Sequence, residues 1–190
     1  NESFTLQKKG AENMNSPFMG DFEVTQQYKP RIHDGLDLVA KGLDKNVHSC
    51  SNGIVIYAYW ENDKNTEQGF GQYVAVQDDI AGSDGVKKVR YYGHLNSINV
   101  KVGQKVKTTD VLGEMGSTGY STGPHCHYEI RSAHYKGAKV YNVSEISGIP
   151  NKLGIYNDGY KPKAQVITKK TIEAIIEIEG HKYSGLLEEK

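Results

Sequence analysis

Residues 125–130 have the sequence HCHYEI, and this stretch guides the interpretation of the rest of the chain. Side chains alternate between the two faces of a β-strand, so His125 and His127 would point to one side and Cys126 to the other. Two imidazoles on one side of a strand are costly to bury unless their ring nitrogens have binding partners. A divalent metal ion is the economical explanation, because zinc binds imidazole nitrogen and carboxylate oxygen.

Three further runs have the composition of β-strands. Residues 53–59, 73–76 and 89–94 are rich in β-branched and aromatic side chains and are bounded by turn-forming residues. The pair Asp84-Gly85 between the second and third runs is a hairpin signal. No segment of the first 148 residues has a sustained apolar period of 3.6 residues. The sequence therefore predicts an all-β, mostly antiparallel fold with glycine-rich loops.

The overall composition excludes two classes of protein. The 190 residues carry 23 basic and 23 acidic side chains, so the formal net charge is zero. A nucleic-acid or anionic-lipid binder usually has a basic excess, and we expect neither partner. No run approaches the roughly 18 apolar residues that a membrane span requires.

Changes in composition divide the chain into three parts. Residues 1–15 are polar and predict an arm or linker remnant, and residues 16–148 predict the main domain. Residues 149–190 begin with loop-forming sequence. Apolar and polar residues then alternate over 172–179, which predicts a β-hairpin. A short helix over 170–179 is the competing interpretation. Because the chain begins with Asn1, we expect a processed form or a piece of a longer protein.

Two more metal donors precede the first predicted core strand. His33 and Asp37 are four residues apart in a loop that contains glycine and enters a strand. A set of three protein ligands that mixes histidine and aspartate leaves one position for water. Such an open position is typical of a catalytic site rather than of a closed structural site.

The sequence around these donors resembles the lysostaphin/LytM-type zinc metalloendopeptidases, which hydrolyse peptide bonds in peptidoglycan. Residues 33–38 (HDGLDL) are similar to the family's His-x-Gly-x-Asp segment, and residues 92–95 (YGHL) to its Tyr-x-His-Leu segment. Residues 116–131 (GSTGYSTGPHCHYEIR) match its glycine-rich approach to His-x-His. The order and spacing of the three segments also agree, over residues 16–148.

The resemblance implies a role for each of five residues. One zinc ion would be held by His33, Asp37 and His127, while His94 and His125 would be catalytic histidines that do not bind the metal. Which of the two acts as the base stays open. The resemblance also implies a metal at the floor of a groove in an antiparallel sheet, walled by loops at residues 60–70 and 113–124.

Some residues near the motifs allow two interpretations. Glu129 would either hold an imidazole from behind or be a solvated strand residue. Tyr92 is expected to be a packed core tyrosine. Cys126 stands where the family usually has an apolar residue, and we expect it to form a reduced, buried pair with Cys50, with a disulfide as the alternative. The family's Phe-Gly-x-Arg before the first ligand is missing here.

The expected function is zinc-dependent hydrolysis of peptidoglycan peptides, in the stem or the cross-bridge. The expected location is extracellular, at the cell wall or on a phage virion, within a larger phage or cell-wall protein such as a phage lysin. One alternative is a catalytically inactive family member that serves as a binding or regulatory module. A second is a biotinyl/lipoyl-type carrier domain, suggested by residues 102–107, but such a domain has no need of a His-x-His pair.

Overall fold

The computed structural model describes residues 16–159, 172–178 and 181–187. The chain divides into two compact units, residues 1–160 and 161–190, and each is described by itself. The arm expected at residues 1–15 lies outside the described residues. Among the described residues there is no helix with the length and apolar character needed to traverse a lipid bilayer.

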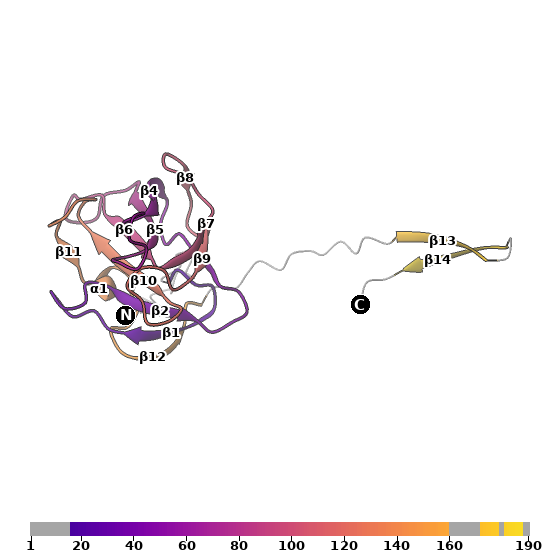
Figure 1. Cartoon of the computed structure of the whole chain (residues 1–190), viewed down its shortest axis with the longest axis horizontal. Coiled ribbons are helices and arrows are strands. Elements are labelled where there is room, and N and C mark those ends of the chain that lie inside the picture. The colour runs from indigo at the N-terminus through magenta and orange to yellow at the C-terminus, as the bar shows by residue number, and fades with distance from the viewer. Residues whose placement is uncertain (1–15, 160–171, 179–180, 188–190) are drawn as a thin grey trace, which may run out of the picture. The chain divides into compact units, whose positions relative to one another are not determined.

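The first unit is built on a nine-stranded sheet in which every pair of neighbouring strands is antiparallel (Figure 1). The strands follow the order β12-β1-β2-β10-β6-β5-β4-β8, and β11 adds to β10. The all-β fold expected from the sequence is thereby confirmed. The strands of this sheet are β1 (Asp21–Gln26), β2 (Leu36–Ala40), β4 (Gly53–Trp60), β5 (Gln72–Asp78), β6 (Val89–Gly93), β8 (Lys105–Val106), β10 (Cys126–Arg131), β11 (Val140–Tyr141) and β12 (Gly154–Asn157).

A smaller sheet and one short helix complete this unit. The three strands β3 (Asn46–His48), β9 (Val111–Met115) and β7 (Leu95–Ile98) pair in that order, again antiparallel. Helix α1 (Val143–Ser147) begins at Asn142, whose side chain accepts a hydrogen bond from the Ser144 backbone N–H. It ends at Gly148, which adopts the left-handed conformation that favours glycine.

The larger of two buried hydrophobic clusters lies on the face of the large sheet opposite to the histidines. On β10, Cys126, Tyr128 and Ile130 are fully buried, as the alternation of the strand predicts. Cys126 lies opposite Leu38 of β2 in the strand register. Full burial of an aliphatic side chain such as that of Ile130 contributes about 1.5–3 kcal/mol. The packing of this face fixes which residues of β2 and β10 point the other way.

Both cysteines are free thiols within this core, as the sequence led us to expect. Burial raises the pKa of the Cys50 thiol to about 11 and that of Cys126 well above its usual value. Thiols held in this state are poor metal ligands and poor nucleophiles at neutral pH. Tyr92 is also a core residue, and its hydroxyl accepts a hydrogen bond of 2.8 Å from the Cys50 backbone N–H.

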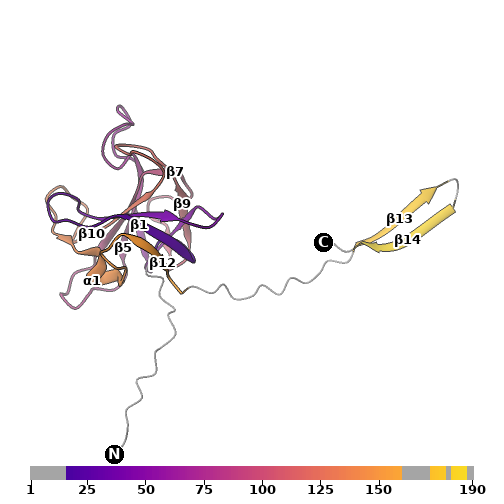
Figure 2. The ribbon, with the colours of Figure 1, turned by 90° about the horizontal axis from the view of Figure 1, so that it is seen from below.

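The first unit extends past residue 148, where the sequence placed the domain boundary. Strand β12 pairs with β1 and forms one edge of the large sheet (Figures 1 and 2). Tyr156 lies opposite Phe22 in the register. Ile149 is only 1% exposed and belongs to the core. The Gly20 N–H also donates to the Asp158 carboxylate at 3.0 Å. Residues 149–158 therefore belong to the domain rather than to a linker.

The second unit contains a β-hairpin. Strands β13 (Ile172–Ile178) and β14 (His181–Leu187) are antiparallel, with register from Ile172 opposite Leu187 to Ile178 opposite His181. Strand structure thus occupies residues 172–178, for which a short helix was the competing interpretation. The preceding residues 160–171 lie outside the described part of the chain.

Candidate metal centre

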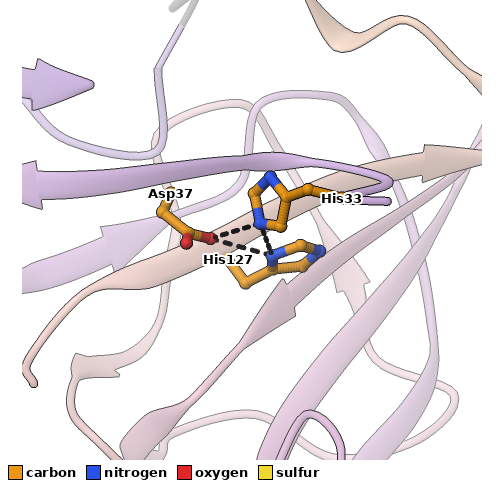
Figure 3. A group of neighbouring side chains, drawn as sticks. All are labelled: His33, Asp37 and His127. Carbon is orange, nitrogen blue, oxygen red and sulfur yellow. Dashed lines mark hydrogen bonds and ion pairs between the residues drawn. The ribbon is translucent and has the colours of Figure 1, made fainter. Parts of the chain in front are cut away.

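Three side chains meet above the large sheet: His33, Asp37 and His127 (Figure 3). Asp37 lies in β2 and His127 in β10, and the two residues are direct partners in the antiparallel register. His33 comes from the loop that leads into β2. Residues far apart in the sequence are thus brought to one place by the pairing of two adjacent strands.

The donor atoms of these residues are close to the spacing that a tetrahedrally coordinated ion requires. His33 Nε2 lies 3.1 Å from Asp37 Oδ1 and 3.2 Å from His127 Nδ1, and the latter two atoms are 2.9 Å apart. An ion about 2.0–2.1 Å from each donor in a tetrahedral arrangement separates the donors by roughly 3.3–3.4 Å. A small divalent cation therefore fits this set with shifts of a few tenths of an ångström.

The outward-facing ring nitrogens of both imidazoles have partners that fix the ring orientation. His33 Nδ1 donates to the Gln27 carbonyl at 2.9 Å. His127 Nε2 lies 3.3 Å from a carboxylate oxygen of Glu129, which is 1% exposed and is also paired with Arg131. Such outer partners commonly orient metal-binding histidines. Of the two interpretations of Glu129, the structure supports contact with an imidazole from behind.

Gly35 has a steric role that sequence reasoning missed. A Cβ atom at this position would lie 2.7 Å from His127 Nε2 and 2.7 Å from the Tyr128 carbonyl oxygen. The missing side chain therefore leaves the space that the His127 ring occupies. The only signal in the sequence was the glycine within HDGLD, whose reason depends on how β2 and β10 pair.

His94 and His125 lie beside the three donors but are not part of their cluster. Their ring centroids are 4.6 Å apart. His94 Nδ1 donates to the Thr118 carbonyl at 2.7 Å, and His125 Nδ1 donates to the Gly123 carbonyl at 2.8 Å. In each neutral ring the proton on Nδ1 leaves Nε2 as the acceptor. His125 Nε2 lies 3.5 Å from Asp37 Oδ1.

The backbone at His94 is unusual. This residue has φ 62°, a left-handed conformation that is uncommon for a residue other than glycine. It separates β6 from β7, and its N–H donates to the Phe70 carbonyl at 2.7 Å. The sharp turn between two strands of different sheets thus places the imidazole beside the metal donors. Backbone conformations of this kind gather at functional sites.

Burial and close contacts shift the pKa values of these groups. Burial alone would raise the pKa of Asp37, but hydrogen bonds from His127 and His33 hold it below its usual range. Burial alone would lower the pKa of His127, but its contacts with Asp37 and Glu129 raise it to about 9. Burial and the neighbouring His125 lower the pKa of His94 to about 4, so its ring is neutral at pH 7.

The five residues form the floor of a groove with a volume of about 390 Å³. Its walls include Ile32 on one side and Tyr120, Ser121 and Thr122 from the loop after β9, and both Ile32 and Tyr120 are 83% exposed. Gly69 and Phe70 from the loop after β4 also line it. Both loops that were expected as walls contribute to it.

The histidines without a predicted role lie elsewhere. His48 is buried, and its Nδ1 lies 3.2 Å from the Pro17 carbonyl. His134 is half-buried, with its Nε2 3.0 Å from the Tyr73 hydroxyl. His181 lies in β14 of the second unit. Neither His48 nor His134 is among the residues that line the groove.

Comparisons with known proteins show the family to which the chain belongs. Residues 31–141 match the model of peptidase family M23. Lysostaphin from Staphylococcus staphylolyticus is 37% identical over 98 residues, which are 52% of this chain and 18% of that protein. The peptidoglycan DD-endopeptidase ShyA of Vibrio cholerae serotype O1 is 32% identical over 131 residues, which are 68% of this chain and 27% of that protein.

A solved structure has the same fold. The catalytic domain of lysostaphin from Staphylococcus simulans superposes with a TM-score of 0.52 at 29% identity, over 66% of this chain and 89% of that domain. The match to the two curated relatives spans less than a third of their length. Because the family model covers more than half of the sequence, the chain belongs to peptidase family M23.

Proposed function

We propose that this protein is a zinc-dependent endopeptidase that hydrolyses peptide bonds in bacterial peptidoglycan. The observation that carries the proposal is the convergence of His33, Asp37 and His127 at near-tetrahedral donor spacing on the floor of an open groove. Peptidoglycan is proposed as the substrate because relatives such as ShyA are named for endopeptidase action on it.

The three donors would hold a single zinc ion. An ion bound there would polarise the scissile carbonyl and lower the pKa of a water molecule towards about 7. Two imidazoles and one carboxylate supply a net charge of −1 when His127 is deprotonated, which suits a divalent cation. The buried Glu129 carboxylate behind His127 favours the ring orientation that this binding requires.

His94 and His125 are proposed as the catalytic histidines. In the neutral form of each ring, the Nδ1–H donates to a backbone carbonyl, so Nε2 can accept a proton. Once protonated, either ring can donate from Nε2 to the oxygen on which negative charge develops. The two imidazoles have equivalent anchoring, so each has the geometry for either role.

We also propose a location and a larger protein context for the enzyme. Its substrate lies outside the cytoplasm, so we place the protein at the cell wall, as a module of a larger wall-lytic protein of bacterial or phage origin. The small share of each curated relative that the match covers supports a modular arrangement.

The test combines metal analysis with identification of the products. Wild type, His94→Ala and His125→Ala would be incubated with peptidoglycan of several chemotypes, and the released muropeptides identified by mass spectrometry. His181→Ala serves as the matched control, because this histidine lies outside residues 31–141, which match the family model. We expect one zinc per chain in all four proteins and hydrolysis by wild type and control only.

Two results would contradict the proposal. A wild-type protein that retains zinc but cleaves no wall peptide would favour the inactive alternative, a binding or regulatory module. A wild-type protein that cleaves wall peptides fully after its metal has been removed would exclude metal-dependent hydrolysis.

A further inference from the structure

A second hollow lies next to the groove of the metal centre. It has a volume of about 420 Å³, and Glu61 and Phe70 line both spaces. The remaining lining residues belong to the second hollow alone, among them Arg131 and Lys136. The two spaces therefore meet at Glu61 and Phe70, and a long substrate in the groove can continue into the hollow.

Phe70, Tyr73 and Tyr91 line the hollow with aromatic rings that pack against one another and form its floor. The ring of Tyr73 stacks on that of Tyr57 at 4.3 Å and on that of Tyr91 at 5.9 Å, with interplanar angles of 16° and 14°. The Phe70 ring lies 5.3 Å from Tyr73. The Tyr73 hydroxyl meets His134 Nε2 at 3.0 Å. Rings held in this way form a preorganised surface, which lowers the entropic cost of binding.

Phe70 also connects this floor to the metal centre. Its ring centroid is 5.4 Å from that of His127, and its carbonyl accepts the hydrogen bond from the His94 N–H. The guanidinium of Arg131 lies over the Phe70 ring at 5.6 Å and over the Tyr91 ring at 4.9 Å. A chain that leaves the groove across Phe70 therefore passes beside the Arg131 guanidinium, which covers part of the aromatic floor.

Charged groups are ordered along the path from the groove into the hollow. Glu61 stands at the shared border, and one of its carboxylate oxygens accepts a hydrogen bond from the Phe70 N–H. Beyond the border stand Arg131, which is paired with Glu129, and the exposed Lys136. Within the described residues, the Lys136 ammonium forms no salt bridge. An acid near the metal centre is thus followed by an unpaired cation further away.

We propose that the hollow is a substrate subsite for a peptide arm that continues from the scissile bond and bears a carboxylate. In this arrangement an N–H of the arm would donate to Glu61, the peptide would lie on the aromatic floor at Phe70, and the carboxylate would pair with Lys136. This inference rests on the proposed function, and it adds the charge that the substrate carries on one side of the cleaved bond.

The experiment pairs a change in the substrate with a change in the protein. Two peptides with a cleavable wall sequence would differ only in bearing a carboxylate or a carboxamide on one arm, and a second pair would carry this difference on the other arm. The full chain would be compared with Lys136→Gln. The control is Lys139→Gln, an exposed lysine that contacts the Tyr141 ring and does not line the hollow.

For one of the two arms, we expect the carboxamide to raise KM roughly two- to fivefold in wild type and in Lys139→Gln, as an exposed ion pair would. The Lys136→Gln variant should show equal KM values for that pair, with kcat unchanged. Cleavage with no dependence on the carboxylate of either arm would overturn the subsite and leave the proposed function intact. A dependence that persists in Lys136→Gln would overturn it as well.

A separate readout covers the case in which no peptide is cleaved. The same peptides would then be titrated into the full-length proteins and binding followed by isothermal calorimetry. A carboxylate-dependent affinity that is lost in Lys136→Gln supports the subsite although the hydrolase proposal has failed. Binding of a peptide-free glycan fragment in the same hollow, with no preference for the carboxylate, would overturn the assignment to a peptide arm.

Discussion

Substitution of Gly35 by alanine tests how the metal centre is assembled. The added Cβ would lie 2.7 Å from His127 Nε2 and from the Tyr128 carbonyl, whereas ordinary contacts begin at 3.4 Å. Tyr128 pairs with Leu36 in the strand ladder, so its carbonyl has little freedom to move. Residue 35 must therefore move away from this carbonyl, and it and the His127 ring must separate by several tenths of an ångström.

The expected consequence is loss of metal affinity with a smaller loss of stability. Metal–ligand distances tolerate deviations of about 0.2 Å, which is less than the required movement of the ring. The displaced ring also loses its contact with Glu129, and removal of such an outer partner commonly costs about 10–100-fold in affinity. We expect at least this loss, while overpacking destabilises the metal-free protein by about 1–3 kcal/mol.

The assay is competition for zinc with a chelator, together with urea unfolding of the metal-free protein. Gly42→Ala is the matched control, because the Cβ added there has its nearest contact at 4.0 Å and φ at this glycine is not in the left-handed region. We expect wild-type affinity in the control. Wild-type affinity in Gly35→Ala would refute the steric reasoning.

Three further predictions concern individual residues. Since the pKa of His127 is raised to about 9, zinc binding should release a proton at pH 7. The apparent zinc affinity should then fall about tenfold per pH unit between pH 8 and 7. Calorimetry in buffers of different ionisation enthalpy would detect the released proton, and zero proton release would contradict the prediction. In the metal-free protein, the same raised pKa of His127 contributes stability that is fully present below about pH 6.5 and is lost as the pH rises through about 9. Urea unfolding of wild type should therefore show lower stability at pH 9.5 than at pH 6.5. The difference between the two pH values should be smaller in His127→Ala. Ile130→Ala should destabilise the domain by about 2–5 kcal/mol in urea unfolding, because the side chain is fully buried, and a change below 1 kcal/mol would be inconsistent with its place in the core.

Local patterns in the sequence were sufficient for much of the fold and for the grouping of the histidines. Alternation placed His127 and Glu129 on one face of a strand and Tyr128 on the other, and the structure has this arrangement. Residue type and spacing suggested His33 and Asp37 as further donors, although nothing local indicates that β2 lies beside β10. The choice of His127 rather than His125 as the ligand came from the family resemblance.

The features that the sequence did not predict depend on long-range contacts. Strand β12 belongs to the domain because Tyr156 pairs with Phe22, at the other end of the chain. The space at Gly35 and the hydrogen bond from His94 to Thr118 likewise arise only once strands from different parts of the chain are paired. Hydrophobic periodicity carries no information about such contacts, since it reports only which face of one element is buried.

The most direct test of the account is anomalous diffraction at the zinc absorption edge from crystals of the zinc-loaded protein. We expect one strong anomalous peak per chain, within bonding distance of His33 Nε2, the Asp37 carboxylate and His127 Nδ1, with His94 outside bonding distance. No peak at this position, or an ion enclosed by four protein ligands that include His94 or His125, would contradict the account.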